Sequence, residues 1–190
     1  METMRIGFAL SGSFCTFDRV IKQVEQLVEM GYEVTPIMSF QSASLDTRFG
    51  TADSFRKRLE SITGRAPLLT MIEVEPIGPK GLFDILVVAP CTGSTLARLA
   101  NGLSDTPVAL AVKSHLRRSR PVILGVSTND ALGASLRNIA FLKNAKHIYF
   151  IPMKQDDTDN KPNSLVADFT RLEDTIRSAT AGVQLQPLFL

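Results

Sequence analysis

Short apolar runs alternate along this chain with longer segments in which apolar residues recur every three or four positions. Runs of the first kind are typical of buried β-strands, and the second spacing is typical of amphipathic helices. Five runs predict the main strands, at residues 6–10, 34–38, 85–89, 122–126 and 148–151. Residues 71–74 are predicted as a short additional strand.

Helical spacing fills the intervals between these strands. After the first strand, Val20, Val24 and Leu27 fall on one face of a helix, and Gly31 provides its C-terminal stop. Pro107 suits the first turn of a later helix. The predicted helices are residues 18–30, 52–62, 96–103 and 107–116, a segment carrying Leu132, Leu136, Ile139 and Ala140, and residues 172–180.

Strands separated by helices favour parallel β-α-β units. We therefore predict an α/β fold, a three-layer αβα sandwich with a mostly parallel Rossmann- or flavodoxin-like sheet, formed by residues 1–190 as a single domain. The pattern does not determine the strand order. Residues 41–50 and 153–165 are long irregular stretches, of the kind that serve as lids, binding loops or oligomer contacts.

Composition narrows the class of protein. The chain has 190 residues, a formal net charge of +2 and 44% hydrophobic residues, with no apolar run of membrane-spanning length and no evident signal peptide. We expect a cytoplasmic protein that binds neither nucleic acid nor a membrane. Cys15 and Cys91 have no disulfide or metal-site spacing, so no metal is expected.

The most informative segment joins the 85–89 strand to the helix after it. Strand ends in an open α/β sheet form the ligand crevice, where small hydroxyl residues allow a flat ligand to approach closely. We therefore expect the cofactor here. The candidate residues are Pro90, Cys91, Thr92, Gly93, Ser94 and Thr95.

A second small-residue turn follows the first strand. Gly12 and Ser13 can direct N–H groups and a hydroxyl at a phosphate, and Ser39 lies at the end of the neighbouring predicted strand. This is not the G-x-G-x-x-G dinucleotide pattern, and Ser-Gly-Ser also makes ordinary turns. Both interpretations of the turn remain open.

Other notable side chains have plain structural interpretations. Cys15 and Cys91 are expected to be packed thiols, and His147 a structural residue. Asn129 either caps a helix, contacts a ligand, or does both. We expect His115 to be exposed on a solvated, basic helix end, and the acidic run to be a solvated loop. The basic cluster is Lys113, His115, Arg117, Arg118 and Arg120, and the acidic run is Asp156, Asp157 and Asp159.

These turns resemble the flavoprotein family that contains the homo-oligomeric flavin-containing cysteine decarboxylases. That family has a Gly/Ser turn after its first strand, a Pro-Ala-Ser-Ala-Asn-Thr motif and a Pro-x-Met-Asn-x-x-Met motif. The second motif corresponds to residues 90–95, and the third, much altered, to residues 126–132. Residues 75–80, 89–93, 127–133, 149–152 and 161–167 are similar to the branch of the family that takes part in dipicolinate synthesis in spore-forming bacteria.

The resemblance implies an FMN-binding fold that assembles into trimers or multiples of them. Gly12, Ser13 and Ser39 would hold the phosphate, and residues 92–95 would line the flavin. It further implies an oxidoreductase subunit that helps convert a dihydropyridine dicarboxylate into the aromatic product during sporulation. The partner would be a second protein that looks like a nicotinamide-binding dehydrogenase. This chain would be located in the cytoplasm of the mother cell.

Departures from the family keep two alternatives open. The third motif lacks both methionines and the proline, leaving only Asn129 as a candidate substrate-binding residue, and residues 40–64 contain no histidine, so cysteine decarboxylation is disfavoured. The chain could instead decarboxylate another carboxylate, or be a non-catalytic assembly partner of the dehydrogenase. Catalytic residues are not identified. Candidate cations for a dianionic substrate are Arg48, Lys80, Lys113 and Lys161.

Overall fold

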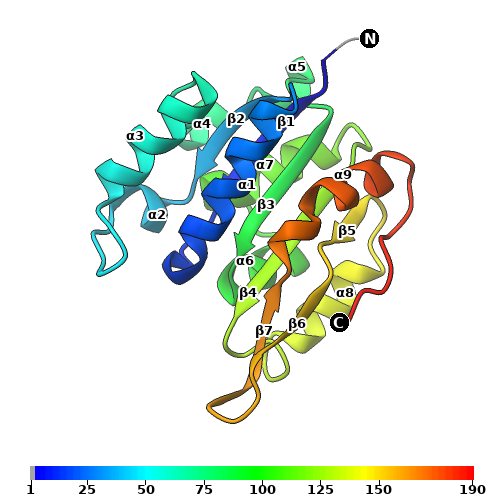
Figure 1. The fold of residues 1–190 in the computed structure, drawn as a ribbon. Coiled ribbons are helices and arrows are strands. Elements are labelled where there is room, and N and C mark those ends of the chain that lie inside the picture. Colours follow the sequence, from blue (N-terminus) through cyan, green and yellow to red (C-terminus); the bar gives the residue numbers. More distant parts are fainter. Residues whose placement is uncertain (1–2) are drawn as a thin grey trace.

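A computed structural model describes residues 3–190 and contains a seven-stranded sheet in three layers (Figure 1). Five strands are parallel, in the order β2-β1-β3-β4-β5, and β6 and β7 form an antiparallel hairpin beside β4. The predicted αβα class and mostly parallel sheet are confirmed. The strands are β1 (Arg5–Leu10), β2 (Glu33–Met38), β3 (Ile85–Cys91), β4 (Val122–Thr128), β5 (Ile148–Phe150), β6 (Met153–Asp157) and β7 (Lys161–Ala167).

Helices cover both faces of this sheet. In Figure 1, α1 and α9 cross the near face, and α7 lies behind the sheet. Within residues 3–190, no helix is long and apolar enough to cross a membrane. The helices are α1 (Phe17–Glu29), α2 (Phe40–Ser44), α3 (Ala52–Thr63), α4 (Met71–Val74), α5 (Ile77–Lys80), α6 (Gly93–Ala100), α7 (Pro107–Leu116), α8 (Leu136–Lys143) and α9 (Leu172–Thr180), with 3₁₀ turns η1 (Phe14–Thr16) and η2 (Phe169–Arg171).

The central strands send alternate side chains into two hydrophobic cores. In β3, Ile85 and Val87 pack with α1, α3 and α9, whereas Leu86 and Val88 pack with α6, α7 and α8. Every residue of β3 is buried, as expected of a parallel strand covered on both faces. The pairing register between β3 and β4 shifts between Val88 and Cys91, just before the carboxyl end of β3.

Two predicted elements differ in the structure. Residues 71–74 form helix α4 rather than a strand, because Thr70 and Glu73 make a reciprocal capping box that starts a helical turn. Residues 153–165, predicted to be irregular, form most of the β6–β7 hairpin. Its strand β7 pairs with β4 through Ser127 and Thr128, beyond the point where β5 ends.

Three smaller boundaries also differ. Thr92 caps α6, so this helix begins at Gly93 and includes the predicted turn. Helix α8 begins only at Leu136, because the N–H of Leu132 donates to the Asn163 carbonyl of β7 (3.0 Å) and residues 129–135 form turns. Residues 41–50 contain most of α2 and a tight turn closed between Thr47 and Gly50.

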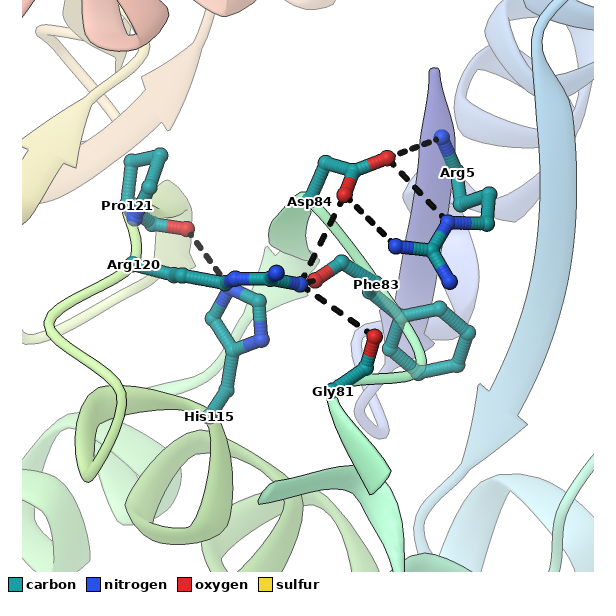
Figure 2. Close-up of polar contacts among 7 residues, drawn as sticks. All are labelled: Arg5, Gly81, Phe83, Asp84, His115, Arg120 and Pro121. Atoms are coloured by element: carbon teal, nitrogen blue, oxygen red, sulfur yellow. Dashed lines mark hydrogen bonds and ion pairs between the residues drawn. The ribbon is translucent and has the colours of Figure 1, made fainter. Parts of the chain in front are cut away.

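A polar network closes the amino-terminal end of the sheet, opposite the strand ends expected to bind ligand. Asp84 accepts bonds from the Arg5 backbone N–H (2.9 Å) and the Arg5 guanidinium (2.8 Å), and pairs with Arg120 (3.5 Å). Arg120 also donates to the carbonyls of Gly81 and Phe83. Figure 2 shows the two guanidinium groups approaching Asp84 from different sides. This network ties β1 to the segments before β3 and β4.

His115 is buried beside this network, which corrects the prediction that it is exposed. Its side chain is 2% exposed, and Nε2 lies 3.2 Å from the Pro121 carbonyl (Figure 2). Residues 108, 111, 112 and 115 share the buried face of α7, so helical spacing places His115 inward although its neighbours are basic. Burial lowers its pKa to about 4, and the imidazole is therefore neutral at pH 7.

We expect Asp84→Asn to lower the free energy of unfolding by about 1 kcal/mol at pH 7, because it removes two part-exposed ion pairs. Partial burial raises the pKa of Asp84, but the bonds from Arg5 outweigh this and leave the pKa below its usual value. Urea unfolding from pH 7 to pH 2 measures the effect. The difference between wild type and variant should shrink as the pH falls below about 4, and a constant difference contradicts this assignment.

His115 should make stability fall as the pH decreases from about 6.5 towards 4. The unfolded chain takes up a proton near pH 6.5, whereas the folded imidazole resists protonation until about pH 4. Relative to wild type, His115→Gln should lose less stability across this interval, as measured by urea titrations at several pH values. Parallel pH profiles for the two proteins would show that His115 does not titrate as described.

Candidate ligand-binding cleft

An open cleft of about 990 Å³ lies at the carboxyl ends of the central strands. Its walls come from the turn after β1, residues 47–49, the start of α6, the segment after β4, the start of α8, and the β6–β7 hairpin. Strands β1 and β3 are neighbours, while the chain leaves them in opposite directions along the sheet, towards β2 and β4. This is the topological switch point at which doubly wound sheets bind ligands.

The ends of β1 and β3 are joined by one buried side chain. The Ser11 hydroxyl donates to the Pro90 carbonyl (2.7 Å) and accepts from the Thr92 N–H (3.0 Å), while the Ser11 N–H also donates to Pro90 (3.2 Å). Ser11 is 1% exposed. These bonds bring the predicted phosphate turn and the predicted flavin turn together at one edge of the sheet.

Helix α6 points its amino-terminal end into the cleft. The Thr92 side chain accepts from the Thr95 N–H (3.3 Å), which leaves the Gly93 and Ser94 N–H groups without a partner inside the helix. The helix dipole adds partial positive charge at this end. The arrangement suits an electron-rich or anionic ligand group.

Gly93 is closely surrounded by side chains, which would have to move to admit a Cβ. A Cβ at this position would lie 2.7 Å from Ser135 Oγ, 2.8 Å from Asp130 Oδ1 and 2.9 Å from Thr128 Oγ1. These three side chains form one cluster, because the Asp130 carboxylate accepts from Thr128 (2.5 Å) and Ser135 (2.9 Å). The start of α6 therefore packs directly against the segment that follows β4.

The turn after β1 is fixed by hydroxyl bonds. The Ser13 hydroxyl lies 2.8 Å from Ser127 Oγ at the end of β4, and Thr16 donates to the Ser13 carbonyl (2.8 Å). Gly12 has room for a side chain, since the nearest atoms to a Cβ would be 3.6 Å away on Gln41 and Phe14.

The structure brings together most of the predicted site residues. Gly12, Ser13, Thr92, Gly93, Ser94 and Asn129 all line the cleft. Pro90, Cys91 and Thr95 are buried behind this lining. Burial raises the pKa of the Cys91 thiol, consistent with the expected packed residue.

Ser39 does not line the cleft. It is 5% exposed, caps α2 by accepting from the Ser42 N–H (3.2 Å), and its backbone N–H donates to Leu10 (3.0 Å). Ser42 Oγ donates to the same Leu10 carbonyl (3.0 Å). Ser39 thus anchors α2 at the end of β1, where Gln41 lies beside Gly12.

Asn129 and Cys15 both face solvent in the cleft. Asn129 does not cap α8, whose N-cap is Ser135. Cys15 is exposed rather than packed, which corrects the prediction. It lies in the 3₁₀ turn η1, whose residues line part of the cleft.

Among residues 3–190, four cations line the cleft, and the sequence analysis named two of them. Arg48 and Lys161 were candidates, whereas Arg19 and Arg137 were missed. Arg19 lies in the first turn of α1 and Arg137 in the first turn of α8, so a search for helix starts after crevice-forming strands would have found both.

Lys80 and Lys113 lie outside this cleft. Lys80 ends α5, and the Lys113 ammonium donates to Ser104 (3.3 Å) beside a separate apolar groove. The acidic run lies on the hairpin, where Asp156 pairs with Lys161 (3.0 Å) and raises the pKa of that lysine. Across residues 3–190, no cluster of three or more His, Cys, Asp or Glu side chains could hold a metal ion.

Comparison with known proteins agrees with this architecture. The chain is 45% identical over 190 residues to the B subunit of dipicolinate synthase from Bacillus subtilis (strain 168), covering 100% of this chain and 95% of that protein. The crystal structure of the corresponding dipicolinate synthase protein from Bacillus halodurans matches with a TM-score of 0.90 and 42% identity, over 98% of this chain and 96% of that one.

A more distant structure shares the fold. Burkholderia xenovorans DmrB in complex with FMN, described as a cubic protein cage for redox transfer, matches with a TM-score of 0.70 and 17% identity, over 94% of this chain and 96% of that one. The family described as Flavoprotein matches residues 1–178. With this match across most of its length and a close relative over its full length, the chain belongs to the flavoprotein family.

Proposed function

We propose that this chain is the FMN-binding subunit of a dipicolinate synthase and contributes to the oxidation of a dihydrodipicolinate-type precursor to dipicolinate. The observation that carries the proposal is the cleft at the β1–β3 switch point, where the Ser13 turn and the start of α6 face one space. Full-length similarity to the B subunit of dipicolinate synthase supports the pathway.

The cleft suits FMN in its size and in its residues. The volume of the cleft lies at the upper end of the range of about 300–1,000 Å³ for small-molecule sites. Phosphate and ribityl oxygens need hydroxyl and N–H donors, which Ser13, Ser94 and the α6 terminus supply. The flat ring system needs an apolar surface, which Phe14 and Phe49 offer. Gly12 and Ser13 would hold the phosphate, and residues 92–94 would line the flavin.

The chain's own groups would bind and orient the reactants. Removing two electrons and two protons makes the dihydropyridine ring aromatic, and FMN, when bound, supplies the two-electron acceptor. Cleft arginines would hold the substrate carboxylates, because a guanidinium fork matches a carboxylate. Ser39 would act indirectly, by fixing α2 beside the phosphate turn.

Partners follow from the same proposal. The chain would act with a dehydrogenase that resembles the A subunit of dipicolinate synthase, and would assemble as a homo-oligomer, a trimer or a multiple of one. It would work in the cytoplasm of the mother cell of a sporulating bacterium. Similarity to a protein named as one subunit of a synthase supports the first partner, and the cage-forming fold relative supports assembly.

Reconstitution with the dehydrogenase tests the proposed function. The two purified proteins, with FMN and the precursor, should form an aromatic product that is detected by its ultraviolet absorbance, while the flavin spectrum reports reduction. The chain without FMN is the matched control. Equal product formation with and without FMN would overturn the oxidative role.

We expect Gly12→Asp to weaken FMN binding at least tenfold, because the carboxylate would repel the phosphate in the turn after β1. Gly12→Asn has nearly the same shape without the charge, and position 12 has room for a Cβ, so this control should retain much more affinity. Titration by flavin fluorescence quenching measures both. Equal affinities of the Asp and Asn variants would place the phosphate elsewhere.

FMN should also protect Cys15 from thiol reagents. Cys15 is exposed on the cleft, whereas Cys91 is fully buried, so the native protein should react at one thiol and the denatured protein at two. Saturating FMN should slow the reaction of Cys15 severalfold, as followed by mass spectrometry. An unchanged rate at saturation would show that FMN does not occupy this cleft.

A further inference from the structure

The cleft carries more positive charge than its own carboxylates neutralise. Arg19, Arg48, Arg137 and Lys161 line it, against only Asp130 and Asp156 among the described residues. Asp156 pairs with Lys161 (3.0 Å), and Asp130 accepts bonds from two neutral hydroxyl groups, which leave its charge in place. Four cations against two carboxylates give this lining a formal excess of two positive charges, and the three arginines are its cations without a carboxylate partner among the described residues.

Among residues 3–190, no ion pair joins Arg19, Arg48 or Arg137 to a carboxylate. Arg19 lies over the Phe169 ring (5.7 Å to the centroid) and Arg48 over the Phe49 ring (4.8 Å). Most arginines elsewhere in the described chain, in contrast, form an ion pair with Asp or Glu. The paired ones are Arg5, Arg56, Arg58, Arg65, Arg98, Arg120 and Arg177.

Arg48 is positioned by a tight turn. Thr47 and Gly50 exchange backbone hydrogen bonds of 3.0 and 3.1 Å, and the Phe49 N–H donates to the Thr47 hydroxyl (3.2 Å). Gly50 has φ +146° and lies against the Phe55 ring of α3, which leaves no room for a Cβ. The turn is thus held on α3, with Arg48 at its tip on the β2 side of the cleft.

Arg137 occupies an unfavourable position for a cation. It lies in the first turn of α8, where the helix dipole disfavours positive charge. Helix α8 follows β4, so Arg137 approaches the cleft from the side opposite Arg48, with β1 and β3 between them. An arginine kept in such a place, facing a cleft and without a carboxylate partner in residues 3–190, indicates an anionic ligand.

We propose that Arg48 and Arg137 are specificity-determining residues that bind the two carboxylates of the pyridine dicarboxylate from opposite sides of the β1–β3 switch point. This inference rests on the proposed function. Two cations on separate elements suit a rigid ligand whose acid groups point apart, because each guanidinium can pair with one carboxylate. Arg19 lies three residues after Thr16, next to the Ser13 turn, and would serve the phosphate instead.

Calorimetric titration of the FMN-loaded protein tests the assignment. The ligands are pyridine-2,6-dicarboxylate and pyridine-2-carboxylate, in a buffer without divalent cations. The wild type should prefer the dicarboxylate by about tenfold or more. Arg48→Gln and Arg137→Gln should each bind it about tenfold more weakly and lose most of this preference, since only one carboxylate remains paired.

Three controls separate this role from others. Arg117→Gln removes an exposed arginine outside the cleft and should leave dicarboxylate affinity unchanged. FMN affinity, titrated separately, should stay within about threefold of wild type in every variant. The thermal midpoint of Arg137→Gln should be unchanged or higher, because the substitution relieves the dipole, whereas a structural arginine would lower it.

The outcomes are distinct. Dicarboxylate affinity unchanged in both variants, or a parallel loss of FMN affinity, overturns the assignment of these arginines. If the wild type binds no FMN, the proposed function fails, and the dicarboxylate titrations are then made on the FMN-free proteins. A tenfold weaker dicarboxylate affinity of the two arginine variants in these titrations supports the assignment of the arginines, and an unchanged affinity overturns it.

Discussion

The whole site depends on the bonds between the ends of β1 and β3. Ser11 is buried at this junction and uses its hydroxyl in both directions, donating to Pro90 and accepting from Thr92. The Ser11 N–H also donates to the Pro90 carbonyl, so backbone and side-chain bonds together join the two strands where their regular pairing ends. The Ser13 turn and the first turn of α6, which both face the cleft, directly follow the residues that this contact joins.

The arginines at the two ends of the sheet differ in their bonding partners. At the amino-terminal end, Arg5 and Arg120 both bind Asp84, and Arg120 also satisfies two carbonyls. At the carboxyl end, Arg19, Arg48 and Arg137 have no carboxylate partner within the described residues. The three cleft arginines are therefore free to pair with a ligand, whereas Arg5 and Arg120 are already used to hold the segments before the strands together.

Periodicity was sufficient to predict the layers, the parallel strands and the edge where the cleft lies. Specific hydrogen bonds determine two features that periodicity did not predict. The capping box at Thr70 makes residues 71–74 helical, and the bond from Leu132 to Asn163 keeps the residues before Leu136 out of α8. His115 was misjudged from its basic neighbours although its helical position pointed inward. Most of the small residues singled out in the sequence line the cleft, but Arg19 and Arg137 lie on helices, and only the packing of those helices brings them to the same space.

The strands shared by both hydrophobic cores have a further consequence. Side chains of β1, β3 and β4 contribute to both cores. If one helix layer detached, apolar side chains of these strands would be exposed to water, and the same strands would support the other layer less well. Opening of one layer therefore also destabilises the other. The sheet and both helix layers should therefore unfold in a single cooperative transition.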